Sequence, residues 1–125
     1  MRYSKDHEWV RSEGSGVAVV GLTAFAVDQL GDVTLVAIDC RVGDKISAGR
    51  AFGTVESAKT LSDVLTPVSG EVVAVHSELE QSPESVNHDN YGEGWLIKVK
   101  VSDPGEVGRL MDADTYAALL ETAAH

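Results

Sequence analysis

The chain consists of short β-branched and apolar runs separated by turns that contain glycine. Runs of this kind, bounded by turn residues, are typical of β-strands. The run at 95–101 alternates strictly, with Trp95, Ile97, Val99 and Val101 on one face and two lysines on the other, as expected of a half-buried strand. The predicted strands are residues 8–12, 17–22, 33–38, 51–56, 62–68, 71–75 and 95–101.

Three segments predict helical structure instead. Thr23 can cap a short helix that Gly31 ends. Residues 78–86 indicate a helical turn that Pro83 interrupts, and residues 112–121 predict a C-terminal helix. The residues expected to cap this last helix or to face inward from it are Asp112, Tyr116, Leu119 and Leu120.

Many short strands with glycine turns predict a mainly β fold with a few short helices and a C-terminal helix. A glycine and an acid open both the 43–46 and the 70–73 segments, one on each side of residues 51–68. This faint repeat favours a β-sandwich with two similar halves. We expect residues 1–125 to form one domain with one modest core.

Composition narrows the classes of function. Hydrophobic residues make up 43% of the chain, and no apolar run approaches the length needed to cross a bilayer. A net charge of −10 disfavours binding to nucleic acid and to anionic membranes. Residues 1–8 lack an apolar signal core and carry acids early. We therefore expect a cytoplasmic protein, or a mitochondrial matrix protein if this is a processed eukaryotic form.

The cysteine and histidine content argues against redox and metal sites. Cys40 is the only cysteine, so an internal disulfide and a Cys-x-x-Cys motif are excluded. We interpret Cys40 as a small apolar filler rather than a nucleophile. The histidines, His7, His76, His88 and His125, lack metal-ligand spacing, so no zinc site is expected.

A lysine lies between two of the predicted strands, those at 51–56 and 62–68, which suggests a hairpin with Lys59 near its tip. A solvated lysine is protonated near neutral pH and is a poor nucleophile, and catalytic lysines are normally desolvated. Lys59 instead has Glu56 and Asp63 nearby in sequence. It therefore suits modification by another enzyme better than catalysis, although an ordinary turn lysine explains this single residue equally well.

Several short motifs around Lys59 and elsewhere along the chain resemble those of a known protein family. Residues 52–59 read F-G-T-V-E-S-A-K, and residues 62–72 read S-D-V-L-T-P-V-S-G-E-V. Residues 7–9 read H-E-W, residues 29–32 read Q-L-G-D, and residues 87–98 read N-H-D-N-Y-G-E-G-W-L-I-K. In this order, over nearly the whole chain, these blocks resemble the glycine cleavage H-protein family.

The resemblance implies a barrel-sandwich hybrid like that of lipoyl and biotinyl carriers, with lipoate attached to Lys59 as an amide. Glu56 and Gly70 match positions that help the lipoate-attaching enzyme to recognise the hairpin. Glu8 and Asp63 match acids that line a cleft near the arm. Taken singly, each of these two acids is equally well explained as a solvated residue at the end of a strand.

The resemblance also implies a monomeric carrier in glycine catabolism rather than an enzyme, with no catalytic or metal-binding residue of its own. The lipoyl arm would take an aminomethyl group from glycine decarboxylase and pass it to aminomethyltransferase. Dihydrolipoamide dehydrogenase would then reoxidise the dithiol. These three enzymes and the lipoate-attaching enzyme are the expected partners.

The chain departs from the family pattern at several positions. The segment 31–44 is one residue longer than usual and lacks the expected proline. Ala24 stands in place of a usual acid, Ala58 and Thr60 flank the lysine where valine and alanine are common, and Asn90 replaces a proline. These differences concern loops and partner affinity and leave the lysine unchanged.

Three other functions are alternatives to a lipoyl carrier: a biotin carrier, an interaction module and a hydrolase. A biotin carrier uses a related hairpin, but its lysine usually lies between methionines, whereas Lys59 lies between Ala58 and Thr60. An interaction module would leave Lys59 unmodified. A stand-alone hydrolase has no support, because the serines and histidines form no recognisable nucleophile motif.

Overall fold

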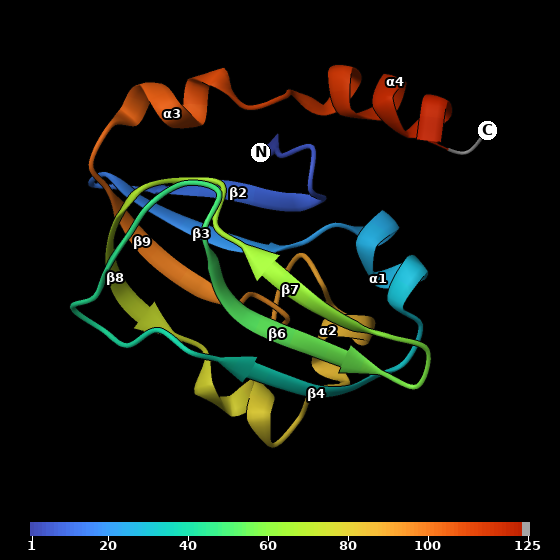
Figure 1. Cartoon of the computed structure of the whole chain (residues 1–125). Coiled ribbons are helices and arrows are strands. Elements are labelled where there is room, and N and C mark those ends of the chain that lie inside the picture. The colour runs from blue at the N-terminus through green and yellow to red at the C-terminus, as the bar shows by residue number, and fades with distance from the viewer. Residues whose placement is uncertain (124–125) are drawn as a thin grey trace.

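Two antiparallel β-sheets face each other in the computed structural model, which describes residues 1–123 (Figure 1). Within these residues the larger sheet has six strands in the order β1-β2-β3-β9-β8-β5, and the smaller has three in the order β4-β6-β7. The prediction of a mainly β sandwich with a few helices is therefore confirmed. His125, considered above as a metal ligand, lies outside the described residues.

The observed strands follow most of the predicted runs to within two residues. The run predicted at 62–68 ends at Leu65, because Pro67 lacks an N–H and the Thr66 hydroxyl bonds locally to the Val68 backbone. The two-residue strands at 2–3 and 45–46 were not among the predicted strands. The strands of the larger sheet are β1 (Arg2–Tyr3), β2 (Glu8–Gly14), β3 (Val17–Leu22), β9 (Ile97–Val101), β8 (Gly70–Val75) and β5 (Lys45–Ile46). Those of the smaller sheet are β4 (Val33–Ile38), β6 (Ala51–Ser57) and β7 (Leu61–Leu65). The two segments of the predicted repeat pair directly with each other, Lys45 opposite Glu71, as neighbouring strands of the larger sheet.

The last strand begins two residues later than the alternation predicts. The Trp95 ring stacks on the His76 ring with 4.4 Å between centroids, and the Lys98 ammonium lies 5.1 Å from the Trp95 centroid. The Trp95 carbonyl also lies 2.7 Å from Nδ1 of His76. Contacts with a residue far away in sequence therefore keep Trp95 out of β9.

The core lies between the sheets and draws on both of them. Alternate positions of the strands point inward and are almost fully buried. Its principal members are Val10, Ala18, Val20, Val36, Phe52, Val55, Val64, Val72, Ile97 and Val99. Cys40 is half-buried against this cluster, and burial raises the pKa of its thiol, as suits an apolar filler.

Trp9 packs on the other face of the larger sheet. It connects the H-E-W motif at 7–9 with the segment 87–98. Its ring covers Gly21, where a Cβ would come within 2.5 Å of ring atom Cε2, so the position requires glycine. Its indole N–H donates to the Asn90 carbonyl over 2.9 Å. The Asn90 side-chain amide in turn donates to the Leu22 carbonyl over 3.0 Å, a bond that the usual proline could not make.

Short helices close the open parts of the sandwich. Helix α1 (Ala24–Leu30) is capped by Thr23, whose hydroxyl accepts from the Ala26 N–H over 3.3 Å, and Gly31 ends it at φ 77°, as predicted. The region around Pro83 forms a 3₁₀ turn η1 (Ser77–Glu80) and helix α2 (Ser85–His88). Across residues 1–123 no helix has the length and apolarity that a bilayer crossing needs.

Two helices run along the outside of the larger sheet near the N-terminus (Figure 1). Helix α4 (Ala113–Ala123) is the predicted C-terminal helix, and Asp112 accepts from the Thr115 N–H over 2.8 Å as its cap. Tyr116 is buried, whereas Leu119 and Leu120 are only half-buried. Helix α3 (Pro104–Arg109) was not predicted.

Candidate functional site

The predicted hairpin around Lys59 is present. Strands β6 and β7 pair antiparallel, with Glu56 opposite Leu61. At the turn, the Ser57 N–H donates to the Thr60 carbonyl over 2.8 Å. The Ser57 hydroxyl oxygen accepts hydrogen bonds from the N–H groups of Lys59 and Thr60, each over 3.2 Å. One side chain thus binds two backbone amides and fixes the conformation of the tip.

Lys59 lies at this tip with an exposed side chain. Its methylene groups pass beside Gly31 at the end of α1, since a Cβ built on Gly31 would lie 3.4 Å from Lys59 Cε. Among residues 1–123 the Lys59 ammonium forms no ion pair within 4.0 Å. The amine is therefore open to an enzyme that acts on it.

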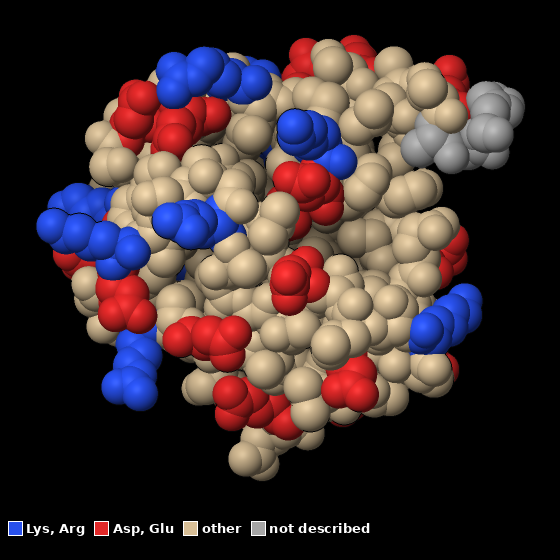
Figure 2. Space-filling view, viewed as in Figure 1, with Lys and Arg blue, Asp and Glu red and all other residues tan. Residues whose placement is uncertain are grey.

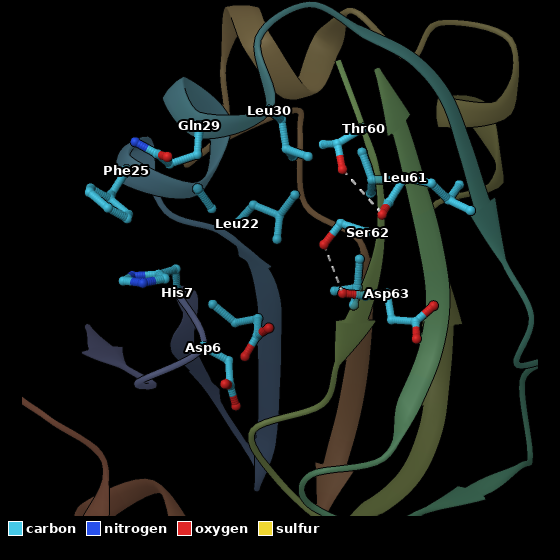
Figure 3. Close-up of a pocket in the computed structure, with 14 residues that line it drawn as sticks. Asp6, His7, Leu22, Phe25, Gln29, Leu30, Thr60, Leu61, Ser62 and Asp63 are labelled. Carbon is cyan, nitrogen blue, oxygen red and sulfur yellow. Dashed lines mark hydrogen bonds between the residues drawn. The ribbon is translucent and has the colours of Figure 1, made fainter. Parts of the chain in front are cut away.

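Two of the predicted acids lie on the same hairpin. Glu56 is exposed on β6 close to the tip, and Asp63 is exposed on β7 opposite Thr54. In Figure 3 the Asp63 carboxylate points away from the side where His7 lies, while the Ser62 hydroxyl points toward that side. Asp63 thus contributes to the wall of the cleft described next, with its charge directed outward.

A cleft of about 360 Å³ opens beside the hairpin, between β7, α1 and the loop that precedes β2 (Figure 3). Its walls are largely apolar, and its polar groups gather where the loop before β2 meets the sheet. The apolar lining includes Leu22, Phe25, Leu30, Leu61 and Val64, and the ionisable side chains at the other end are Asp6, His7 and Glu8.

Glu8 is the most buried charged group of the cleft, with 3% of its surface exposed. Its Oε1 accepts a hydrogen bond from the Ser4 hydroxyl over 2.6 Å. Burial raises the pKa of Glu8 to about 7, against hydrogen bonds from Ser4 and the Leu65 backbone, and the charge of Asp6 adds to the rise. Near neutral pH the cleft therefore contains a carboxyl that readily gains or loses a proton.

His7 lines the same end and is held by a hydrogen-bond network. Its Nδ1 lies 2.8 Å from the Tyr116 hydroxyl, which lies 2.7 Å from the Thr23 hydroxyl. Burial lowers the pKa of His7, which favours the neutral imidazole at neutral pH. Because Thr23 caps α1, the network joins α4 to the helix that forms one wall of the cleft.

Gly70 does not lie near the tip. It opens β8 opposite Ile46 and Val101 in the larger sheet, far from the turn of the β6–β7 hairpin (Figure 1). A Cβ on Gly70 would collide with the Lys100 carbonyl oxygen and lie 2.9 Å from Val99 Cγ1. Glycine is therefore required here by the close approach of β8 and β9.

Several residues of the site were not predicted. Ser4 and Asp6 precede Glu8 closely, whereas Phe25 and Tyr116 come from distant segments that only the fold brings to the same place. The spacing of Ser4 four residues before Glu8 was the one local signal of that contact. In the described part of the chain, no group of three or more His, Cys, Asp or Glu side chains is placed to hold a metal ion.

Comparison with known proteins gives consistent results. Residues 1–123 match the family profile described as "Glycine cleavage H-protein". The chain is 50% identical over 118 residues to the glycine cleavage system H protein of Symbiobacterium thermophilum, covering 94% of this chain and 91% of that one. The H protein of Aeromonas salmonicida is 48% identical, with 97% and 93% covered.

A solved structure agrees as well. The crystal structure of a glycine cleavage system H protein from Mycobacterium marinum superposes with a TM-score of 0.85 at 38% identity. The match covers 95% of this chain and 94% of the other. At 38% identity the two chains are similar in amino-acid sequence as well as in fold.

Proposed function

The chain belongs to the glycine cleavage H-protein family, and from this premise we propose that it is a lipoyl carrier whose working group is attached to Lys59. The observation that carries the proposal is an exposed lysine on a rigid turn, beside a cleft of about 360 Å³. The hairpin is the modification site and the cleft is the resting place of the arm.

The residues present suit a lipoyl group. Lipoate is an apolar acyl chain that ends in a dithiolane, and Leu22, Phe25 and Leu30 offer apolar walls next to the tip. Attachment as an amide removes the charge of Lys59, so no ammonium is desolvated when the arm lies against these walls. When attached, lipoate supplies a disulfide that accepts an aminomethyl group together with two electrons.

Glu8 stabilises the aminomethyl group that the lipoyl arm carries. An aminomethyl group carries an ammonium, and Glu8 is a buried carboxyl whose pKa of about 7 lets it ionise when a cation arrives. An ionised carboxylate and an ammonium form a charge-assisted hydrogen bond, stronger in a cleft than in water. We assign Asp63 a weaker supporting role, because its carboxylate is exposed and directed outward.

The scaffold contributes recognition rather than catalysis. We propose that glycine decarboxylase, aminomethyltransferase and dihydrolipoamide dehydrogenase each dock on the same rigid β surface while the arm moves. Glu56, exposed near the tip, takes part in recognition by the lipoate-attaching enzyme. The H proteins of Symbiobacterium thermophilum and Aeromonas salmonicida are bacterial, which supports a bacterial cytoplasmic location for this chain.

Peptide mass spectrometry tests the modification. The chain is incubated with lipoate, ATP and a lipoate–protein ligase, and the Lys59→Arg variant is the control. We expect a lipoyl mass on the Lys59 peptide of the wild type alone. A biotin adduct after treatment with a biotin ligase would assign the chain to carboxyl transfer, and no adduct with either enzyme would favour an unmodified interaction module.

Adduct decay tests the cleft. Lipoylated wild type, Glu8→Gln and Asp63→Asn are loaded with the aminomethyl group and freed of the loading enzyme, and release of formaldehyde and ammonia is timed. We expect decay to be about tenfold faster in Glu8→Gln and less than threefold faster in Asp63→Asn. Equal lifetimes in all three proteins would remove the cleft acids from the mechanism.

A further inference from the structure

Large apolar side chains with high exposure are few in the described part of the chain. They are Met1, Leu35, Val42 and Leu61. Leu61 is 65% exposed and Leu35 is 46% exposed. A single exposed leucine needs no explanation, so their arrangement decides whether these two matter.

Leu35 and Leu61 lie in one row across the smaller sheet. The register places Leu35 opposite Glu56 on the neighbouring strand, and Glu56 opposite Leu61 on the next. Residues in register across a sheet point to the same face, and all three are exposed. With strands about 5 Å apart, the row spans roughly 10 Å of surface. We call Leu35, Glu56 and Leu61 the tip row, because Glu56 and Leu61 flank the turn that bears Lys59.

The face around the tip row is acidic. Asp63 lies two positions from Leu61 on the same strand and face, and it is exposed. Viewed onto this sheet, Figure 2 shows acidic side chains over its middle, with most of the basic ones toward its margins. The chain as a whole carries a net charge of −10. A partner that covers the tip row therefore needs apolar groups opposite the two leucines, and cationic groups opposite Glu56 and around the row.

The length of the lysine side chain identifies the partner. A lysine spans only about 6 Å from Cα to Nζ, so the enzyme that acylates Lys59 must bring its active site against the tip itself. The enzymes that act on the dithiolane meet it at the end of a much longer arm. Only the first kind of enzyme is forced to cover residues next to the turn.

We propose that the tip row is the docking surface for the lipoate-attaching enzyme, which covers Leu35 and Leu61 with apolar side chains and faces Glu56 with a cationic one. This inference rests on the proposed function, since it assumes that Lys59 is lipoylated. It assigns to Leu35 and Leu61 a role in substrate recognition that is separate from the fold, and Leu61 has this role in addition to lining the cleft. Lipoylation precedes any contact of the arm with the cleft, so its rate does not depend on that lining.

The test compares lipoylation rates of conservative variants. Leu35→Thr, Leu61→Thr and the double variant keep strand propensity while removing apolar surface. Val42→Thr is the matched control, because Val42 is also 65% exposed but lies in the loop between β4 and β5. The value of kcat/KM is measured for each protein with a lipoate–protein ligase, lipoate and ATP.

We expect kcat/KM to fall about tenfold in each single variant and about a hundredfold in the double variant, with Val42→Thr within twofold of wild type. Acylation of Lys59 by N-hydroxysuccinimidyl acetate should proceed equally fast in all of them, because the tip remains intact. Raising the salt concentration should lower kcat/KM of the wild type.

The outcomes separate this inference from the proposed function. If wild type is lipoylated on Lys59 and the leucine variants react as fast as it does, the docking surface is overturned and the carrier proposal stands. Slower reaction of the variants with the small acylating reagent as well would also overturn it, by showing a distorted tip. A wild type that the ligase never modifies would overturn both proposals.

Discussion

At the scale of single residues, Glu8 combines burial with a titration near neutral pH. Its pKa of about 7 lies well above the 4.5 of a solvated glutamate, because burial disfavours the charged form. Between these two values the folded chain binds a proton that the unfolded chain has released. Stability must therefore fall as pH rises through this window.

The first prediction concerns this linkage. Glu8→Gln removes the titration and keeps a group that the Ser4 hydroxyl can reach. The free energy of unfolding of wild type should fall relative to that of Glu8→Gln by about 3 kcal/mol between pH 4 and pH 8. Urea unfolding of both proteins across this range measures the difference, in which other titrating groups cancel. Parallel profiles would contradict a raised pKa at Glu8.

Gly70 is needed for the close pairing of two strands, while the part in lipoylation that the family resemblance implies for it stays a prediction. A Cβ there would collide with the Lys100 carbonyl oxygen, in the pairing of β8 with β9 and away from the hairpin tip. Any influence of Gly70 on lipoylation is therefore expected to pass through the stability of the sheet.

The second prediction follows for Gly70→Ala. The added methyl group should cost about 2 kcal/mol or more, since the strands cannot separate without losing hydrogen bonds. Differential scanning calorimetry should show a lower Tm, while lipoylation of the folded variant well below that Tm stays within twofold of wild type. A fully stable Gly70→Ala protein that resists lipoylation would instead give Gly70 a direct role in recognition.

At the scale of elements, the hairpin owes its fixed tip to one side chain. Ser57 accepts hydrogen bonds from the N–H groups of Lys59 and Thr60, so the lysine leaves the turn in a defined direction. Ser62 lies on the same hairpin, but its hydroxyl contacts only the carbonyl of the adjacent Asp63 among the described residues. The two serines therefore form a matched pair.

The third prediction uses this pair. In Ser57→Ala the N–H groups of Lys59 and Thr60 lose their acceptor, and their hydrogen exchange should quicken about tenfold. Ser62→Ala should leave both rates unchanged. Amide exchange followed by NMR reads out the two residues directly. Unchanged protection in Ser57→Ala would show that strand pairing alone holds the turn.

Elements with local signals were predictable from the sequence. Thr23 and Gly31 cap the two ends of α1, and the apolar strand segments on both sides of Lys59 mark the turn between them. Helix α3 was missed because its short segment contains two glycines, although its Asp103 cap and Pro104 are recognisable helix starts. Trp95 was wrongly assigned to the last strand, since its stacking on His76 depends on a distant residue. The strand predicted at 62–68 was too long, since Pro67 cannot donate to a partner strand.

The cleft could be predicted only in part. The family pattern pointed to Glu8 and Asp63, but the apolar walls formed by Leu22, Phe25 and Leu30 come from segments that sequence patterns treat separately. Strand alternation shows why Asp63 and Ser62 cannot both point into the cleft. Which of the two does so depends on the register of β7, and the sequence alone does not set that register.

At the scale of the whole molecule, the C-terminal helix is tied to the cleft. Tyr116 reaches His7 and Thr23 with its hydroxyl and stacks on Tyr3, with ring centroids 4.7 Å apart. Helix α4 thereby joins the loop before β2 to the start of α1. We propose that residues 1–125 unfold as one domain because such contacts connect its ends.

The fourth prediction tests this connection. Tyr116→Phe keeps the stacking but removes the hydroxyl, and it should lower the free energy of unfolding by about 1–2 kcal/mol within a single transition. Tyr3→Phe is the control, because no hydrogen bond of the Tyr3 hydroxyl is found within the described residues. Denaturant unfolding followed by near-ultraviolet circular dichroism compares them. Equal stabilities of the two variants, or a separate early transition, would contradict the account.

The proposed carrier function depends on a lipoyl group attached to Lys59. The most direct measurement is glycine-dependent NADH formation in a mixture of glycine decarboxylase, aminomethyltransferase with tetrahydrofolate, dihydrolipoamide dehydrogenase and this chain. We predict turnover with the lipoylated wild type, and only background with the unmodified chain or with Lys59→Arg taken through the same lipoylation. Equal turnover by Lys59→Arg, or none by wild type with a lipoyl group on Lys59, would contradict it.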